Sequence, residues 1–286
     1  MKNKIFLNDK LYASEEAKIS VLDRGFLFSD GIYELIPYFN SKPFLFNEHY
    51  SRLKNSLKMI RLDNPYSDNE WSEKINSFIN GCDYLNFSLY IQITRGVPEI
   101  INDGVLREHA ATKKYNVSVC MFCSQIDNLS EFMIKEKTAI TMDDMRWLQC
   151  DIKSISLLYN SLAKTEAHRQ GSYEAILIRD NSVTEGCASN VFIVKNDVIK
   201  TAPQSNLILP GVTRSFFINE IIKKNKFQFI EKNMTKEELV SADEVFITNS
   251  TQGILPITYI DKIKVNNGKC GVITKKLHQY FLKSIN

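Results

Sequence analysis

The chain has 286 residues, of which 44% are hydrophobic and 24% are charged, a composition ordinary for a soluble globular protein with room for two domains. Its formal net charge of +3 gives no reason to expect a nucleic acid or an acidic surface as a partner. No stretch approaches the roughly 20 apolar residues of a membrane span, and the N-terminus lacks the apolar core of a signal peptide. We therefore expect a cytoplasmic protein that binds neither membrane nor nucleic acid.

The six cysteines are scattered along the chain, which is typical of free thiols in a reducing compartment. Cys120 and Cys123 form a C-x-x-C motif, but the surrounding residues alternate as a strand. The two thiols would then leave opposite faces of that strand. We expect no metal site.

Two helices are predicted in the N-terminal half. Asn47 is placed to cap the first, whose apolar residues recur at helical spacing. Ser67 and Glu70 form a capping-box pattern that begins the second, which would stop near Gly81. The clearest strand is 87–94, where apolar and polar residues alternate. The other predicted strands of this half are 5–7, 17–19, 32–39, 44–46 and 116–123, with loops at 23–31 and 96–115.

The polar segment 124–137 is predicted to link two domains, 1–123 and 138–286. The predicted elements of the second half are strands at 138–142, 173–179, 190–194 and 244–248, helices at 155–170, 212–225 and 272–282, and a tight turn at 249–253. This pattern predicts two α+β domains, with a cleft between them as the ligand site.

Lys153 and Glu185 bracket one predicted helix and one predicted strand. An amine attacks a carbonyl only when neutral, so a catalytic lysine needs apolar or cationic surroundings that lower its pKa. Apolar residues and Arg146 are close to Lys153 in the sequence. Taken alone, Lys153 would be interpreted as a solvated surface lysine, and Glu185 as a residue at the exit of an ordinary hairpin.

Several short motifs, taken in order, change this interpretation. The chain closely resembles the class IV, fold-type IV pyridoxal-phosphate aminotransferases, and within them the D-amino-acid aminotransferases, over nearly its whole length. The motifs are Asp144-Met145-Arg146-Trp147, Asp151-Ile152-Lys153-Ser154, Ala163-Lys164-Thr165-Glu166-Ala167, Tyr173-Glu174-Ala175, Thr184-Glu185-Gly186 and Ser189-Asn190-Val191-Phe192. The resemblance implies a smaller N-terminal α/β domain, a larger C-terminal α+β domain of pseudo-barrel form, and the cofactor in the cleft between them.

The resemblance also implies roles for individual residues. Lys153 would form a Schiff base with pyridoxal 5'-phosphate and then carry a proton, while Glu185 would keep the ring nitrogen protonated. The turn before the predicted helix at 212 can offer peptide N–H groups to a phosphate. The implied cofactor-binding residues are Arg52, Lys153, Glu185, Leu209, Val212, Thr213 and Ser250.

Substrate binding is implied for Tyr33 and Thr251, and for the pair Arg107 and His109. The family places an Arg-x-His pair soon after Thr-Arg-Gly, whereas here the segment 97–106 intervenes. The pair either reaches the carboxylate site on a longer loop, in this family often a loop of the neighbouring subunit, or forms a solvated surface cluster. Ala188 is a second departure, because the family tends to carry a small hydroxyl residue there.

The function predicted from these residues is transfer of the amino group of a D-amino acid, of the D-alanine type, to a 2-oxo acid such as 2-oxoglutarate. Two alternatives share every cofactor residue: a 4-amino-4-deoxychorismate lyase and a branched-chain L-amino-acid aminotransferase. A binding protein that has lost catalysis is a fourth reading, which the complete set of cofactor residues disfavours. The resemblance implies a homodimer.

Overall fold

A computed structural model of the chain describes residues 4–100, 107–127 and 136–285. The chain forms two compact units, the first made of Met1–Asp127 with Ile152–Ser156 and the second of Asn128–Asp151 with Leu157–Asn286. The first unit therefore takes up a short segment from far along the sequence. The domain limits 1–123, 124–137 and 138–286 stay a prediction.

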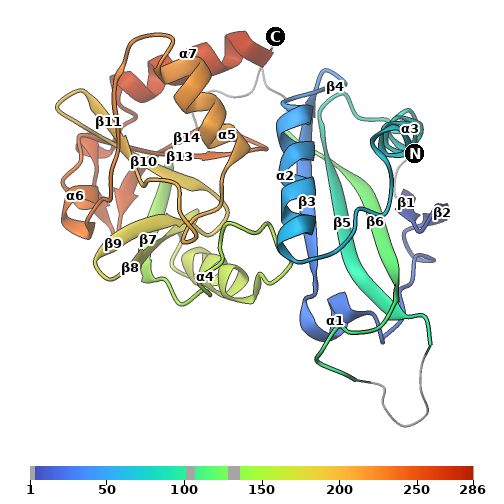
Figure 1. Cartoon of the computed structure of the whole chain (residues 1–286). Coiled ribbons are helices and arrows are strands. Elements are labelled where there is room, and N and C mark those ends of the chain that lie inside the picture. The colour runs from blue at the N-terminus through green and yellow to red at the C-terminus, as the bar shows by residue number, and fades with distance from the viewer. Residues whose placement is uncertain (1–3, 101–106, 128–135, 286) are drawn as a thin grey trace. The chain divides into compact units, whose positions relative to one another are not determined.

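The first unit is built on a six-stranded antiparallel sheet in the order β2-β1-β6-β5-β3-β4 (Figure 1). Its helices are α1 (Arg24–Phe28), α2 (Phe46–Met59) and α3 (Asp68–Ile79). The strands are β1 (Lys4–Leu7), β2 (Lys10–Ala13), β3 (Gly31–Phe39), β4 (Lys42–Pro43), β5 (Phe87–Pro98) and β6 (Tyr115–Gln125). The predicted strands at 17–19 and 44–46 are wrong, because β1 pairs with β2 and residues 44–46 lead into α2.

The two longer helices of this unit begin differently. At α3 the predicted capping box is confirmed, since Ser67 Oγ accepts from the N–H of Glu70 and the Glu70 carboxylate accepts from the N–H of Ser67. Such a cap is worth about 1 kcal/mol. At α2 the predicted cap Asn47 is wrong: the helix starts at Phe46, and Leu45 precedes it in a left-handed conformation with no side-chain cap.

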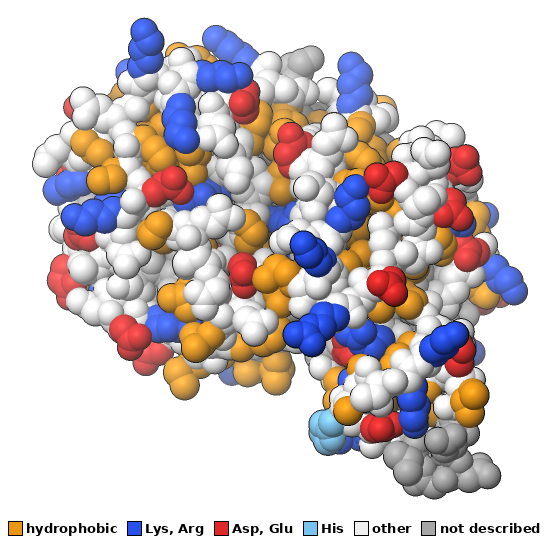
Figure 2. All heavy atoms as spheres, viewed as in Figure 1, with side chains coloured by type: hydrophobic (Ala, Val, Ile, Leu, Met, Phe, Trp, Pro, Cys, Tyr) orange, Lys and Arg blue, Asp and Glu red, His pale blue; other side chains and the backbone are white. Residues whose placement is uncertain are grey.

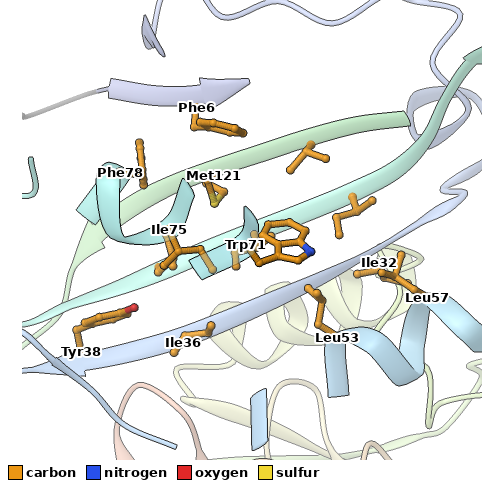
Figure 3. Close-up of a cluster of buried hydrophobic side chains, with 14 of the residues drawn as sticks. Phe6, Ile32, Ile36, Tyr38, Leu53, Leu57, Trp71, Ile75, Phe78 and Met121 are labelled. Carbon is orange, nitrogen blue, oxygen red and sulfur yellow. The ribbon is translucent and has the colours of Figure 1, made fainter. Parts of the chain in front are cut away.

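The core of the first unit lies between the sheet and these helices. Figure 3 shows Trp71 and Ile75 of α3 and Leu53 and Leu57 of α2 directed toward apolar side chains of the strands. Trp71 is 1% exposed, which places its large ring entirely inside. Burying an aliphatic or aromatic side chain in this way contributes about 1.5–3 kcal/mol. The helical and alternating periodicities of the sequence are thus used to fill one core.

The segment Ile152–Ser156 adds to the free edge of β3. The N–H of Tyr33 donates to the Lys153 carbonyl at 3.0 Å, and the N–H of Ile155 donates to the Gly31 carbonyl at 3.1 Å. A bridge pairs Ile32 with Ser154. The predicted helix at 155–170 therefore begins later, at Leu158, because the residues before it are held extended.

The second unit carries a nine-stranded sheet that curls into a half-barrel. Its main path is β12-β11-β10-β13-β14-β7-β8-β9, with β15 paired to β14, and it mixes parallel and antiparallel neighbours (Figure 1). The strands are β7 (Lys137–Asp143), β8 (Glu174–Arg179), β9 (Ser182–Gly186), β10 (Asn190–Lys195), β11 (Val198–Thr201), β12 (Gln228–Glu231), β13 (Glu244–Asn249), β14 (Gly253–Ile260) and β15 (Ile263–Lys264).

The helices of the second unit are α4 (Leu158–Arg169), α5 (Val212–Phe216), α6 (Lys236–Val240) and α7 (Val272–Ile285). A π-helical turn, Phe217–Ile222, continues α5, so the helix predicted at 212–225 is not a uniform α-helix. Apolar side chains of α5, of this turn and of α7 pack together, as in the stacked rings of Phe217 and Phe281 at 5.6 Å. α5 itself begins directly after Gly211, which stands at its N-cap.

Tight two-residue turns join several neighbouring strands of both units. In each, both residues have positive φ, the conformation that matches the twist of a hairpin and favours Asn and Asp. The turns are Asn8-Asp9, Asn40-Ser41, Asp180-Asn181, Asn196-Asp197 and Asp261-Lys262. Local sequence chemistry thus sets the register of five strand pairs.

The charged side chains on the face of the molecule seen in Figure 2 are of both signs and interspersed, in keeping with the small net charge. Within the described residues, none of the helices is long and apolar enough to cross a membrane.

Candidate active site

Lys153 lies at the edge of the first unit's sheet, with its main chain fixed on both sides. Its carbonyl accepts from Tyr33, and its own N–H donates to Ser56 Oγ of α2 at 3.3 Å. The preceding residue, Ile152, is buried in the core, whereas the Lys153 side chain is partly exposed. Lys153 Nζ lies 4.2 Å from the centroid of the Tyr33 ring. The amine is thus presented from a rigid backbone against an aromatic face.

Arg52 of α2 is held by a buried carboxylate. Its Nε donates to Glu34 Oε1 at 2.6 Å and its Nη2 donates to Glu34 Oε2 at 2.9 Å, so the pair is bidentate. His49 Nδ1 lies 2.8 Å from Glu34 Oε2. Burial alone would raise the pKa of Glu34, but Arg52 and His49 hold it well below its ordinary value. Burial lowers the pKa of His49. Arg52 is therefore a fixed cation in the first unit.

Glu185 is the buried carboxylate of β9 in the second unit. Arg146 Nη1 donates to its Oε1 at 2.5 Å, and the Leu209 N–H donates to Oε2 at 3.0 Å. Asn190 Nδ2 also donates to Oε2, at 3.1 Å. Burial raises the pKa of the Glu185 carboxyl to about 7, with Arg146 acting in the opposite direction. The result is a desolvated carboxylate aimed by three donors, able to hold a proton or to share one.

Asn190 links Glu185 to the turn that starts α5. Its Nδ2 also donates to the Leu209 carbonyl at 3.1 Å. A Cβ on Gly211 would stand 2.0 Å from Asn190 Oδ1, so a side chain here would force Asn190 or the turn to move. The first turn of α5 has no side-chain cap, which leaves the N–H groups of Val212 and Thr213 without an intrahelical partner. This helix start has the features of an anion-binding site.

Arg214 follows in the same turn but is directed into the protein. Its Nη2 donates to the Ala202 carbonyl at 2.8 Å and to Glu231 Oε1 at 2.6 Å. Its side chain is therefore engaged in fixing the turn.

Ser250 and Thr251 lie in the turn between β13 and β14. Thr251 Oγ1 donates to Asn249 Oδ1 at 3.2 Å, and the Gln252 N–H donates to the same oxygen at 2.9 Å. The register of β10 and β13 pairs Asn190 with Thr248. In the second unit the structure thus brings together Glu185, the Leu209–Thr213 turn and the end of β13.

The Arg107–His109 segment packs beside α1 in the first unit. Arg24 donates to the carbonyls of Glu108 and His109 at 2.6 and 2.9 Å. The Phe28 ring contacts both side chains. Its centroid lies 4.4 Å from the Arg107 guanidinium and 5.2 Å from the centroid of the His109 ring. Both side chains are exposed. Residues 101–106 of the preceding insertion lie outside the described residues.

The predicted site residues thus fall into one set in each unit. Tyr33, Arg52 and Lys153 belong to the first unit together with Arg107 and His109. The second set belongs to the other unit and comprises Glu185, Leu209, Val212, Thr213, Ser250 and Thr251. No group of three or more potential metal-ligating side chains occurs at 4–100, 107–127 or 136–285.

Sequence reasoning misses two partners of these residues, Glu34 and Asn190. Arg146, considered from the sequence as a cation near Lys153, instead donates to Glu185. Asn190 stands inside a motif that carries the resemblance, which is its only signal. Glu34 had a signal of its own, because a carboxylate between buried apolar positions of a strand requires a cationic partner.

Comparison with known proteins gives the family of the chain. Residues 31–260 match the family model described as amino-transferase class IV. D-alanine aminotransferase of Listeria monocytogenes serotype 1/2a (strain 10403S) is 40% identical over 284 residues, covering 99% of this chain and 96% of the relative. D-alanine aminotransferase of Bacillus licheniformis is 37% identical over 282 residues, covering 99% and 97%.

Solved structures of aminotransferases match nearly the whole length of the chain. The Thermoproteus uzoniensis branched-chain aminotransferase with norvaline has a TM-score of 0.84 at 27% identity and covers 99% of this chain and 94% of its own. The Escherichia coli branched-chain amino acid aminotransferase has a TM-score of 0.85 at 25% identity, with coverage of 99% and 95%. The fold is the fold-type IV architecture. This chain is an enzyme that belongs to the class IV aminotransferases.

Proposed function

We propose that this protein is a pyridoxal-phosphate-dependent D-amino-acid aminotransferase that moves the amino group of D-alanine to 2-oxoglutarate. The substrate class is supported by the D-alanine aminotransferases that share 37–40% of its residues over its full length. The observation that carries the cofactor assignment is the buried Glu185 carboxylate, held by Arg146, the Leu209 N–H and Asn190.

The residues present fit pyridoxal phosphate. An anion aimed by fixed donors suits a pyridine nitrogen, and the uncapped start of α5 suits a phosphate. Gly211 supports this reading, because any side chain there would collide with Asn190. Lys153 would hold the cofactor's carbonyl carbon, Glu185 its ring nitrogen and Leu209 the face of its ring. The phosphate would be held by the N–H groups of Val212 and Thr213, by the hydroxyls of Thr213 and Ser250, and by Arg52.

Pyridoxal phosphate, when bound, supplies an electron-accepting ring that makes the substrate's α-proton acidic. Lys153 then carries that proton on Nζ, which its fixed main chain keeps beside the Tyr33 ring. Glu185 would accept a hydrogen bond from the protonated ring nitrogen and so favour that protonated form. Burial of Glu185 excludes the water that would otherwise weaken this interaction.

Recognition of the substrate carboxylate is assigned to Tyr33, Thr251 and the Arg107–His109 pair. Arg107 and His109 are exposed and ordered against Phe28, so they are available to a carboxylate of their own subunit or of a second copy of the chain. We propose a homodimer in the cytoplasm. Light scattering on the purified protein would test this, with twice the chain mass of 32.9 kDa expected.

A branched-chain L-amino-acid aminotransferase is the second candidate, because the superposed structures carry that activity in their names. A 4-amino-4-deoxychorismate lyase is the third. The test is to supply purified enzyme and pyridoxal phosphate with D-alanine and 2-oxoglutarate, with L-leucine and 2-oxoglutarate, or with 4-amino-4-deoxychorismate. Pyruvate from D-alanine at the highest kcat/KM is expected. A higher kcat/KM for L-leucine, or pyruvate from 4-amino-4-deoxychorismate alone, would overturn the proposal.

A further inference from the structure

We propose that Asp144 is a positioning residue that holds Arg146 against Glu185 and thereby favours the ionised form of Glu185. This rests on the proposed function in so far as Glu185 faces the cofactor ring. The contacts that carry it all lie within the second unit.

Asp144 follows directly after β7, and its carboxylate is wholly buried. Its main chain is anchored, because its N–H donates to the Ile178 carbonyl at 2.7 Å. Oδ1 accepts from the N–H and the Nε of Arg146 at 3.1 and 2.9 Å, and it lies 3.1 Å from Arg179 Nη2. Oδ2 accepts from Arg146 Nη2 and from Thr184 Oγ1, both at 2.8 Å.

The contacts between Asp144 and Arg146 fix the plane of the guanidinium. Nε and Nη2 both point at Asp144 in a two-point fork, so rotation about the end of the side chain is removed. The remaining nitrogen, Nη1, is then directed at Glu185 Oε1 at 2.5 Å. Arg179 fixes the main chain of Arg146, since its Nη2 donates to the Arg146 carbonyl at 2.6 Å. Arg146 Nη2 also donates to the Leu207 carbonyl at 3.2 Å. Asp144 thus holds two of the three guanidinium nitrogens in the place from which the third reaches Glu185.

Asp144 also acts on Glu185 directly. Its negative charge raises the pKa of Glu185, whereas the Arg146 that it holds lowers that pKa. Among the described residues, Arg146, Asp144 and the Cys150 thiol interact electrostatically with Glu185, and Arg179 pairs with Asp144. Through space, the negative charge of Asp144 opposes ionisation of Glu185, but this effect is smaller than that of Arg146, which is in direct contact. If the two carboxylates interacted only through space, neutralising Asp144 would make Glu185 more acidic. If Asp144 positions Arg146, the same change makes Glu185 less acidic.

The experiment follows the titration of Glu185 in the holoenzyme by infrared difference spectroscopy. Each protein is compared with its own Glu185→Gln counterpart, so the protonated-carboxyl band that differs belongs to Glu185. In Asp144→Asn the new amide nitrogen faces hydrogen-bond donors, so Arg146 is no longer held in place. The midpoint of the Glu185 titration should then rise by about one pH unit or more, which is a tenfold change in its ionisation equilibrium. A midpoint that is unchanged or lower would overturn the proposal. Asp143→Asn, the same change at an exposed neighbour, should leave the midpoint where it is.

Thr184→Val provides a second variant in case Asp144→Asn does not fold. It removes the hydrogen bonds that Thr184 Oγ1 donates to Asp144 and to the Leu177 carbonyl, and a 3.5 Å contact from Arg146 Nη2, without changing any charge. A through-space effect therefore predicts no shift, whereas positioning of Arg146 predicts a smaller upward shift. An unmoved midpoint in a folded Thr184→Val protein would again count against the proposal. Absence of D-alanine activity in the wild type would defeat the proposed function alone, because the comparison of midpoints does not depend on turnover.

Discussion

Glu34 Oε1 and Arg52 Nε lie 2.6 Å apart, and the Glu34 side chain is wholly buried. Replacing Glu34 by Gln keeps the shape but leaves the Arg52 charge without its counter-ion. Breaking a buried ion pair in this way costs about 3–5 kcal/mol. Urea unfolding of the cofactor-free protein at neutral pH should show that loss. Glu73→Gln, at an exposed position of α3, should change the free energy of unfolding by less than about 0.5 kcal/mol.

The Glu34 pair also predicts a pH dependence. The pKa of Glu34 is lower in the folded chain than its ordinary value of 4.5, so its contribution to stability is complete above that value. It is lost as the pH falls below 4.5 toward the folded pKa. The difference in unfolding free energy between wild type and Glu34→Gln should therefore shrink on acidification. A difference that is constant down to about pH 3 would contradict the assigned charge state.

Lys153→Ala is expected to abolish transamination while leaving the fold unchanged. The loss should exceed roughly 10³-fold, because one amine serves as both nucleophile and proton carrier. Borohydride reduction of the wild-type holoenzyme, followed by peptide mapping, should locate the cofactor on Lys153. Lys58→Ala, an exposed lysine of α2, serves as the control and should retain full turnover. Substantial turnover by Lys153→Ala would remove Lys153 from the mechanism.

Gly211→Ala should weaken pyridoxal-phosphate binding more than it weakens the fold. The new methyl group would stand 2.0 Å from Asn190 Oδ1, so Asn190 or the α5 turn must shift. Equilibrium titration with pyridoxal phosphate should show a Kd raised by about tenfold or more, corresponding to about 1.4 kcal/mol. Gln204→Ala, at an exposed site in the preceding loop, is the matched control. Equal Kd values for the two variants would argue against a phosphate at this helix start.

Arg107→Ala should raise the KM for D-alanine, because a charged partner of the carboxylate is lost. A hydrogen bond to a charged group is worth about 1.5–3 kcal/mol, which corresponds to a rise of roughly 10- to 150-fold. Stability should change little, since the side chain is exposed. Lys114→Ala removes a positive charge from the same loop and should leave the KM unchanged. If both variants keep the wild-type KM, the Arg107–His109 pair is a surface cluster.

Much of the fold was predictable wherever local chemistry and packing agree. The structure confirms the helix predicted from the capping box at Ser67, the strand predicted from the alternation along β5, and the helix predicted from the apolar spacing of α2. Predictions failed where a tertiary contact decides the outcome. Ile155 starts no helix, because it hydrogen-bonds to β3 beside the bridge between Ser154 and Ile32. The sequence predicts a loop at 23–31 because of its two glycines, but the structure forms the short helix α1 there, with the cap Asp23 accepting from the Gly25 N–H.

The same contrast holds for the candidate site. The roles of Lys153 and Glu185 came from a resemblance, and neither spacing nor composition would have assigned them. What the sequence could not give is the set of partners that aim these groups. Arg146 and Asn190 reach Glu185 from other elements, so their geometry exists only once the second unit's sheet has formed.

The chain leaves the second unit after Asp151, supplies Ile152–Ser156 to the first, and returns at Leu157. A truncated protein that stops within 124–137 would keep six strands and three helices but lose the edge segment that covers β3 and bears the amine. The complementary fragment would carry that lysine with no β3 to hold it. Neither half made alone would present Lys153 in its native setting, so co-expression of the two fragments, rather than either one by itself, is the way to regain it.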